Sequence, residues 1–183
     1  MDKKVLLSSF IILLMVTSIA GFIFIPQDNS GNSEKRVYDG IEFVRTNDRW
    51  FTTVNNNQYS ILISPDQLSK QNSINLNDLR RAQKIYISVN PKNNLQRILP
   101  ELNYFLSFVN TRIVSSCYLD IPECRSLTLK TCKDATELNK VIVIKTEENT
   151  KISYTNNCLQ MIGTESEIVK FIDELIVSVI KNE

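Results

Sequence analysis

The sequence contains no histidine and only four glycines. Histidine is the commonest general base, the commonest metal ligand and the usual partner of a catalytic serine or cysteine, so its absence counts against most hydrolases and metalloenzymes. The glycines are too widely spaced for a phosphate-binding loop, a dinucleotide-binding motif or a Gly-x-Ser-x-Gly nucleophile elbow. We therefore expect no cofactor and no metal ion, and the sequence favours a non-catalytic protein.

Neither sign of charge is in excess. The chain has 21 Lys and Arg against 20 Asp and Glu, and without Asp2, Lys3 and Lys4 the remainder holds 19 of each. A neutral domain without a long basic run is a poor candidate for binding nucleic acid, because phosphate neutralisation dominates that affinity. It is an equally poor candidate for electrostatic attachment to an anionic lipid surface.

One long apolar segment is present, from Val5 to Ile25, and it carries no charge. At about 1.5 Å per residue, a helix of this length spans the hydrocarbon core of a bilayer. Lys3 and Lys4 precede it, which places the N-terminus in the cytoplasm and the C-terminus outside. We predict a membrane anchor at 1–26, with the lipid bilayer as its partner.

After the anchor we predict a polar spacer at 27–36 and one extracytoplasmic domain at 37–183, giving a single-pass protein of the cell membrane. Two alternatives remain for the apolar segment. One is a cleaved signal peptide, since Ser18-Ile19-Ala20 resembles a cleavage site. The other is a buried helix of a soluble protein.

Four cysteines, Cys117, Cys124, Cys132 and Cys158, lie in the second half of the chain. An even number in an oxidising compartment indicates two disulfide bonds. Three pairings are possible, of which we favour Cys117–Cys124 with Cys132–Cys158. Zinc bound by four thiolates is an alternative, although a zinc site usually includes a close Cys-x₂₋₄-Cys pair, which is missing. Free buried thiols are a further alternative.

The predicted fold is α/β or α+β. Alternating apolar residues, with turn residues between them, predict a three-stranded antiparallel meander at 38–45, 49–54 and 59–64. Short apolar runs predict a mixed sheet whose strands are at 85–89, 112–117, 126–132, 141–145 and 151–162, the last with a bulge or turn at Asn156-Asn157.

Two helices are expected on this sheet. The first, at 99–111, follows from apolar residues at helical spacing, and Pro100 is acceptable only in the first turn. The second, at 164–181, begins with a capping box formed by Thr164 and Glu167. We interpret Asp173 and Glu174 as part of its solvent-exposed face.

Several polar or aromatic groups are candidate sites, and for each we favour a structural role. Trp50 and Tyr59 suggest an aromatic binding surface, but packing of the sheet on its helix is the favoured role. A carboxylate cluster could form from Asp120, Glu123 and Asp134, and a Ser/Lys pair from Ser115, Ser116 and Lys130. A basic cluster consists of Arg80, Arg81 and Lys84.

The stretches CRSLTLKTC, VIVIK and NNCLQMIG, followed by the capped terminal helix, resemble the C-terminal part of uncharacterised single-pass membrane-anchored archaeal proteins with a cysteine-containing outer domain. The resemblance covers about the last 70 residues. It implies a location in the cell envelope and brings no activity with it.

We predict a non-catalytic envelope module that binds a protein or glycan partner. An accessory subunit of a membrane complex is the first alternative, because small and hydroxyl residues in the anchor can contact other spanning helices. These are Ser8, Ser9, Thr17, Ser18 and Gly21. An extracytoplasmic hydrolase is the second alternative, and no pattern predicts an oligomeric state.

Overall fold

The computed structural model describes residues 34–69, 76–109 and 111–182. The chain divides into two compact units, Met1–Ser33 and Glu34–Glu183, and every described residue belongs to the second unit. The predicted anchor, Val5–Ile25, therefore lies outside the described residues. Within the described residues, no helix is both long and apolar enough to cross a membrane.

The first sheet is an antiparallel meander of four strands, not the three that the sequence predicted. The strands are β1 (Lys35–Tyr38), β2 (Ile41–Thr46), β3 (Arg49–Val54) and β4 (Asn57–Ile61). The prediction of one strand at 38–45 was wrong because Asp39 and Gly40 turn the chain, with φ of 53° and 84°. Two successive residues with positive φ form the kind of tight turn that joins paired strands. Lys35 and Arg36, which the sequence analysis placed in the spacer, pair with β2 as part of β1.

The second sheet is mixed and has the strand order β7-β6-β5-β8-β10-β9. All of its neighbouring strands run parallel except β9, which is antiparallel to β10. The bounds are β5 (Lys84–Val89), β6 (Arg112–Cys117), β7 (Thr128–Leu129), β8 (Asn139–Thr146), β9 (Lys151–Thr155) and β10 (Cys158–Gly163). The mixed sheet predicted from the apolar runs is confirmed.

Two predicted parts of this sheet differ in detail. The strand expected at 126–132 is reduced to Thr128–Leu129, because the Thr131 side chain caps a short 3-10 helix, η3 (Cys132–Asp134), by bonding with Asp134. The strand or bent pair expected at 151–162 is the hairpin β9–β10. Its turn residues, Asn156 and Asn157, have positive φ of 49° and 65°.

The two predicted helices are present as α3 (Ile98–Ser107) and α4 (Glu165–Lys181). The α4 capping box is formed as expected, since the Thr164 N–H donates to Glu167 Oε2 at 2.9 Å and the Glu167 N–H donates to Thr164 Oγ1 at 3.4 Å. A third, short helix, α2 (Leu76–Arg80), was not predicted. Two further 3-10 turns are η1 (Pro65–Gln67) and η2 (Pro122–Cys124).

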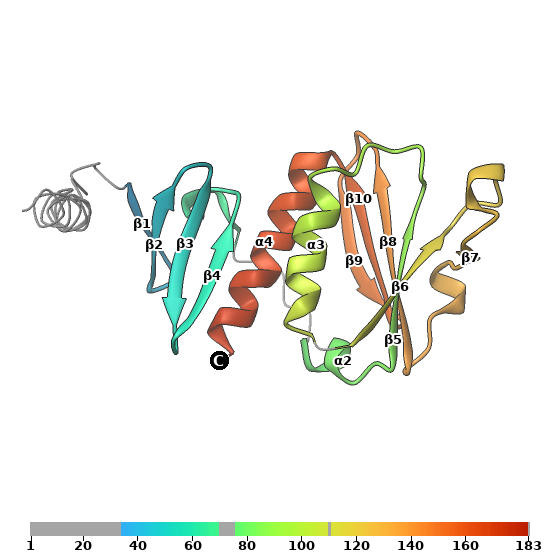
Figure 1. Ribbon diagram of the computed structural model, residues 1–183, viewed down its shortest axis with the longest axis horizontal. Coiled ribbons are helices and arrows are strands. Elements are labelled where there is room, and N and C mark those ends of the chain that lie inside the picture. The colour runs from blue at the N-terminus through green and yellow to red at the C-terminus, as the bar shows by residue number, and fades with distance from the viewer. Residues whose placement is uncertain (1–33, 70–75, 110, 183) are drawn as a thin grey trace, which may run out of the picture. The chain divides into compact units, whose positions relative to one another are not determined.

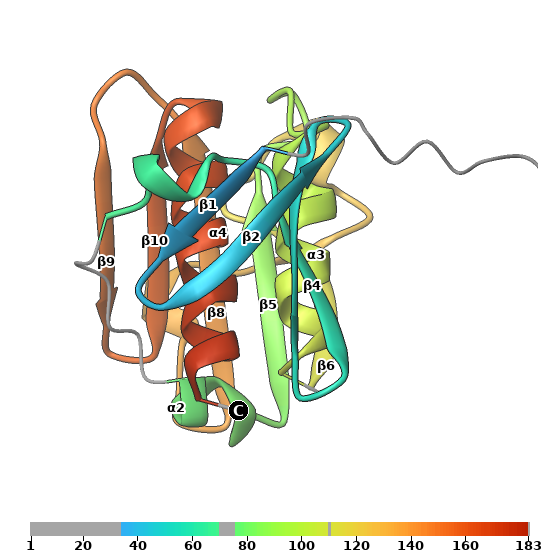
Figure 2. The same cartoon turned by 90° about the vertical axis from the view of Figure 1, so that its left-hand side faces the viewer.

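Helices α3 and α4 lie between the two sheets (Figures 1 and 2). Their buried residues form one core with residues of both sheets, including Phe43 and Ile61 of the first and Ile142 and Leu159 of the second. The opposite face of the second sheet carries a small separate cluster built on Val141, Val143 and Cys158. The described domain is therefore α+β, with a helical layer buried on two sides.

Candidate functional site

The four predicted disulfide cysteines form two bonds, Cys117–Cys124 and Cys132–Cys158. Their Cα–Cα distances are 5.9 Å and 5.3 Å, within the usual range for disulfides. The disulfide prediction is confirmed, in the pairing that the sequence analysis favoured. The Cys132–Cys158 bond fastens η3 to β10, beside Val141 and Val143, and the Cys117–Cys124 bond fastens η2 to the end of β6.

The aromatic surface considered for Trp50 and Tyr59 is not present. Trp50 is 3% exposed and Tyr59 is 1% exposed, and both belong to the main core. The packing interpretation is therefore the correct one for these two residues.

The other sequence candidates do not converge. Glu123 pairs with Lys92 at 3.0 Å on the surface, while Asp134 bonds to Thr131 at the start of η3. The ammonium of Lys130 lies over the Tyr86 ring, 5.2 Å from its centroid. Ser116 is fully buried, and its Oγ has no hydrogen-bond partner in the structure.

The prediction that Asp173 and Glu174 lie on a solvent-exposed face of α4 was wrong. Asp173 is 0% exposed and Glu174 is 7% exposed. One oxygen of Asp173, Oδ2, accepts the backbone N–H groups of Leu62 and Ile63 at 2.9 Å and 2.7 Å. Glu174 Oε1 accepts the Ser69 N–H at 2.9 Å. These carboxylates bind the chain that leaves β4, so they join the first sheet to the helices.

Helix α3 contributes to the same joint. Glu101, 3% exposed, forms a two-pronged ion pair with Arg49 at 2.7 Å and 2.8 Å, and this contact raises the pKa of Arg49. The hydroxyl of Tyr104 accepts the Ser60 N–H of β4 at 3.2 Å. Burial raises the pKa of Asp173 to about 7, and Glu101 adds to the rise, although the two N–H groups and Arg49 oppose it.

A second buried polar cluster surrounds Lys140, which begins the apolar part of β8 and is 1% exposed. Its Nζ lies 2.8 Å from Asp78 Oδ1 and 2.6 Å from Asn157 Oδ1. The Tyr154 hydroxyl donates to Asp78 Oδ2. Burial favours a higher pKa for Asp78, but the Lys140 and Tyr154 contacts outweigh it and lower this pKa. The sequence offered one signal, a lysine directly before the apolar run VIVI.

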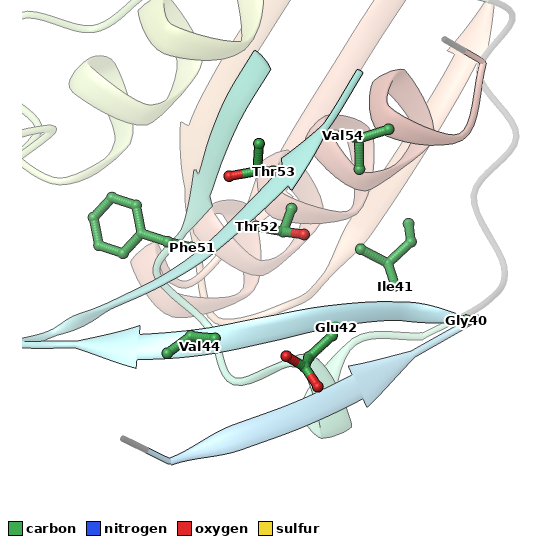
Figure 3. A pocket seen from close by; sticks show the side chains of 8 residues that line it. All are labelled: Gly40, Ile41, Glu42, Val44, Phe51, Thr52, Thr53 and Val54. Carbon is green, nitrogen blue, oxygen red and sulfur yellow. The ribbon is translucent and has the colours of Figure 1, made fainter. Parts of the chain in front are cut away.

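A groove lies in a gap between β2 and β3, which we call the strand wedge. The two strands pair only at Val44↔Phe51, Arg45↔Trp50 and Thr46↔Arg49. Beyond Val44 and Phe51 they separate, and the hairpins β1–β2 and β3–β4 diverge (Figure 2). A groove of about 460 Å³ lies there (Figure 3), lined by Gly40, Ile41, Glu42, Val44, Phe51, Thr52, Thr53 and Val54.

Backbone groups point into the strand wedge. The N–H of Arg45 donates to Glu34, on the side of β2 that faces β1. Because successive residues of a strand direct these groups to opposite sides, Glu42 and Val44 face β3. Val44 pairs with Phe51, so Thr53, two residues further along β3, faces β2. The register stops before Glu42 and Thr53, which leaves their backbone groups without a partner across the gap.

Both apolar and polar side chains line the strand wedge. Ile41, Val44, Phe51 and Val54 are half-buried and line the groove. Its charged member, Glu42, is paired at 2.9 Å with Lys35 on the neighbouring strand. The arrangement supplies hydrogen-bonding backbone and apolar contacts, and it is suited to binding an extended chain.

No protein-family model, curated protein or solved structure matches this chain.

Proposed function

We propose that this protein is a non-catalytic module of the cell envelope, anchored in the membrane by Val5–Ile25, that binds an extended segment of a partner protein in the strand wedge. The observation that carries the proposal is the early end of the β2–β3 register. It leaves two strands side by side with backbone groups facing an open groove. A partner strand that enters there completes the sheet by β-strand addition.

The compartment is supported by the disulfides. Two disulfide bonds in a domain of this size are typical of proteins that fold outside the cytoplasm, where thiols are oxidised. The uncharged run from Val5 to Ile25 and the lysines before it support an anchor with its C-terminal side outside.

A protein partner is favoured over a glycan. Glycan recognition commonly uses an exposed aromatic ring, and the two rings considered for that purpose, Trp50 and Tyr59, are buried in the core. The strand wedge instead presents main-chain donors and acceptors at the spacing of a β-strand. In β-strand addition the main-chain bonds give affinity, while pockets for alternate side chains give specificity.

The test is photo-crosslinking in intact cells with a benzophenone amino acid in place of Phe51. Val37 is the matched control position, because it lies on the same face of the sheet, outside the groove, and is 68% exposed. We expect one defined adduct from position 51, mapped by mass spectrometry to a single segment of one protein. Equal labelling from position 37 contradicts the proposal, as does an adduct that resists protease and carries sugar.

A backbone variant tests the mode of binding. Thr53→Pro removes the N–H that faces the wedge, and the pairing with β4 does not use that N–H. We expect the adduct from position 51 to be lost in Thr53→Pro and retained in Thr53→Val. An adduct that survives the proline excludes β-strand addition.

A topology test accompanies these experiments. Thiol alkylation of intact cells with a membrane-impermeant reagent should label the four cysteines only after reduction. Labelling without reductant, or only after cell lysis, contradicts the envelope location.

A further inference from the structure

Three groups that together can form an amide bond meet around Lys140. The primary amine lies 2.6 Å from the side-chain carbonyl oxygen of Asn157 and 2.8 Å from a carboxylate oxygen of Asp78. The lysine side chain is 1% exposed, so water is largely excluded from the amine. Asp78 is 32% exposed, which leaves a route to solvent on one side of the cluster.

We propose that Lys140 and Asn157 become joined by an intramolecular isopeptide bond, with Asp78 as the group that carries the proton. This inference is independent of the proposed binding function. The bond links the start of β8 to the turn of the β9–β10 hairpin, directly beside the Cys132–Cys158 disulfide.

The reaction is balanced without any further reactant. Asp78 takes a proton from the Lys140 ammonium, and the free amine attacks Cγ of Asn157. A Cγ–Nζ bond forms and the Cγ–Nδ2 bond breaks as Asp78 passes its proton to the departing nitrogen. The second proton that Nζ releases on becoming an amide then returns to Asp78, which ends the reaction protonated or passes that proton to the ammonia. The products are the cross-linked chain and one molecule of ammonia, and nothing is oxidised or reduced.

An amine and an amide do not react at a useful rate in water, and the fold favours the reaction by holding the two groups in contact. Holding two reacting groups in contact replaces a bimolecular encounter, with effective concentrations on the order of 10⁵–10⁸ M in favourable cases. The Asp78 carboxylate lies 2.8 Å from the ammonium, so it is placed to take the proton directly. Asp78 is ionised at rest, since its neighbours lower its pKa, so it is ready to accept the proton.

Asn157 is held firmly for this attack. It lies in the left-handed region, with φ of 65°, at the second position of a two-residue turn. Its backbone carbonyl accepts the N–H of Val141 at 3.3 Å, next to Lys140 in the chain. Each partner is thus fixed by backbone pairing within one residue of the reacting side chain.

The test is the intact mass of the full-length purified chain after reduction and alkylation. The Lys140→Arg variant is the reference, because it keeps the positive charge beside Asp78 and cannot form the amide. After correction for the mass difference between lysine and arginine, we expect the wild-type chain to be lighter than the variant by the mass of one ammonia. The comparison cancels any processing of the N-terminus, which both chains share.

Digestion with trypsin locates the bond. Trypsin does not cleave after an acylated lysine, so peptide 134–145 should appear intact and joined to peptide 152–170. Asn156→Asp is the matched control and should still lose ammonia, whereas Asp78→Asn should prevent the loss. A wild-type chain of full mass overturns the proposal. A deficit of one water in place of one ammonia assigns the bond to Asp78 and overturns the role of Asn157.

Discussion

Replacing Asp173 by asparagine should change how the stability of the domain depends on pH. Asp173 is 0% exposed, one of its oxygens accepts two backbone N–H groups, and the other has no partner. Burial and the nearby Glu101 raise the pKa of its carboxyl from the ordinary 3.8 to about 7. One pKa unit corresponds to about 1.4 kcal/mol, so the change in proton affinity on folding is about 4 kcal/mol.

The sign follows from the number of protons bound. Between about pH 4 and pH 7 the folded chain keeps the Asp173 proton, while the unfolded chain has lost it. The contribution of this group to the free energy of unfolding is therefore fully present below pH 4. It falls by about 4 kcal/mol as the pH rises to 7 and is constant above that value.

Asparagine retains an acceptor oxygen for the Leu62 and Ile63 N–H groups and does not titrate. Its amide nitrogen takes the place of the unpartnered oxygen, at a cost of about 1–3 kcal/mol that is the same at every pH. The quantity to compare is therefore the difference in unfolding free energy between variant and wild type at pH 4 and at pH 8. We expect that difference to shift by about 4 kcal/mol in favour of the variant at the higher pH.

The assay is urea denaturation of the full chain in detergent, followed by the fluorescence of Trp50. Trp50 is the only tryptophan, and it is buried in the first sheet, on the side of the joint that Asp173 holds. Asp48→Asn, in an exposed turn, controls for the loss of one carboxylate. Parallel pH profiles for Asp173→Asn and wild type would refute the reasoning, because they mean that the buried carboxyl titrates as it does in water.

Three further predictions concern stability. Replacing Cys132 and Cys158 together by serine should lower the free energy of unfolding by about 2–4 kcal/mol relative to oxidised wild type, measured by urea denaturation. The difference should vanish when both proteins are fully reduced. Thr164→Ala should cost about 1 kcal/mol in the same assay and Thr164→Ser almost nothing, since serine keeps the oxygen that caps α4. Gly40→Ala should cost about 1–2 kcal/mol and Gly40→Asn less, because φ of 84° strains most side chains and asparagine tolerates it better. No atom lies within 4 Å of an added Cβ there, so equal costs for the two Gly40 variants would show that the strain argument fails.

The elements that could be predicted from the sequence are those determined by residues close together in the chain. The run VIVIK has apolar residues on both faces of a strand, and it forms β8 with buried residues on both sides. Thr164 and Glu167 are spaced as a capping box, and α4 begins directly after Thr164. The Asp39-Gly40 turn was also readable, because such a pair is a strong hairpin signal. The prediction of one strand at 38–45 rested instead on the apolar alternation, which continues across the turn.

The buried carboxylates depend on contacts far apart in the sequence. Asp173 lies one helical turn from Val169 and from Val177, both of which are buried. This second apolar stripe was visible in the sequence and signals a helix covered on two sides. The partners of Asp173, the N–H groups of Leu62 and Ile63, are more than a hundred residues away, and only the fold brings them together. The same holds for Arg49 and Glu101, whose separation is 52 residues.

The two sides of the first sheet are treated differently, and the contrast supports the binding proposal. Strand β4 ends the sheet beside the helices. Tyr104 of α3 accepts the outward N–H of Ser60, and Asp173 of α4 accepts the N–H groups of Leu62 and Ile63, which follow the strand. Proteins usually cover free strand edges in this way, because an uncovered edge invites pairing with another chain. The strand wedge receives no such cover within the described residues, although Glu42 and Thr53 direct backbone groups into it. A fold that closes the β4 edge with buried side chains, while β2 and β3 separate inside the same sheet, is consistent with selection for pairing in the strand wedge.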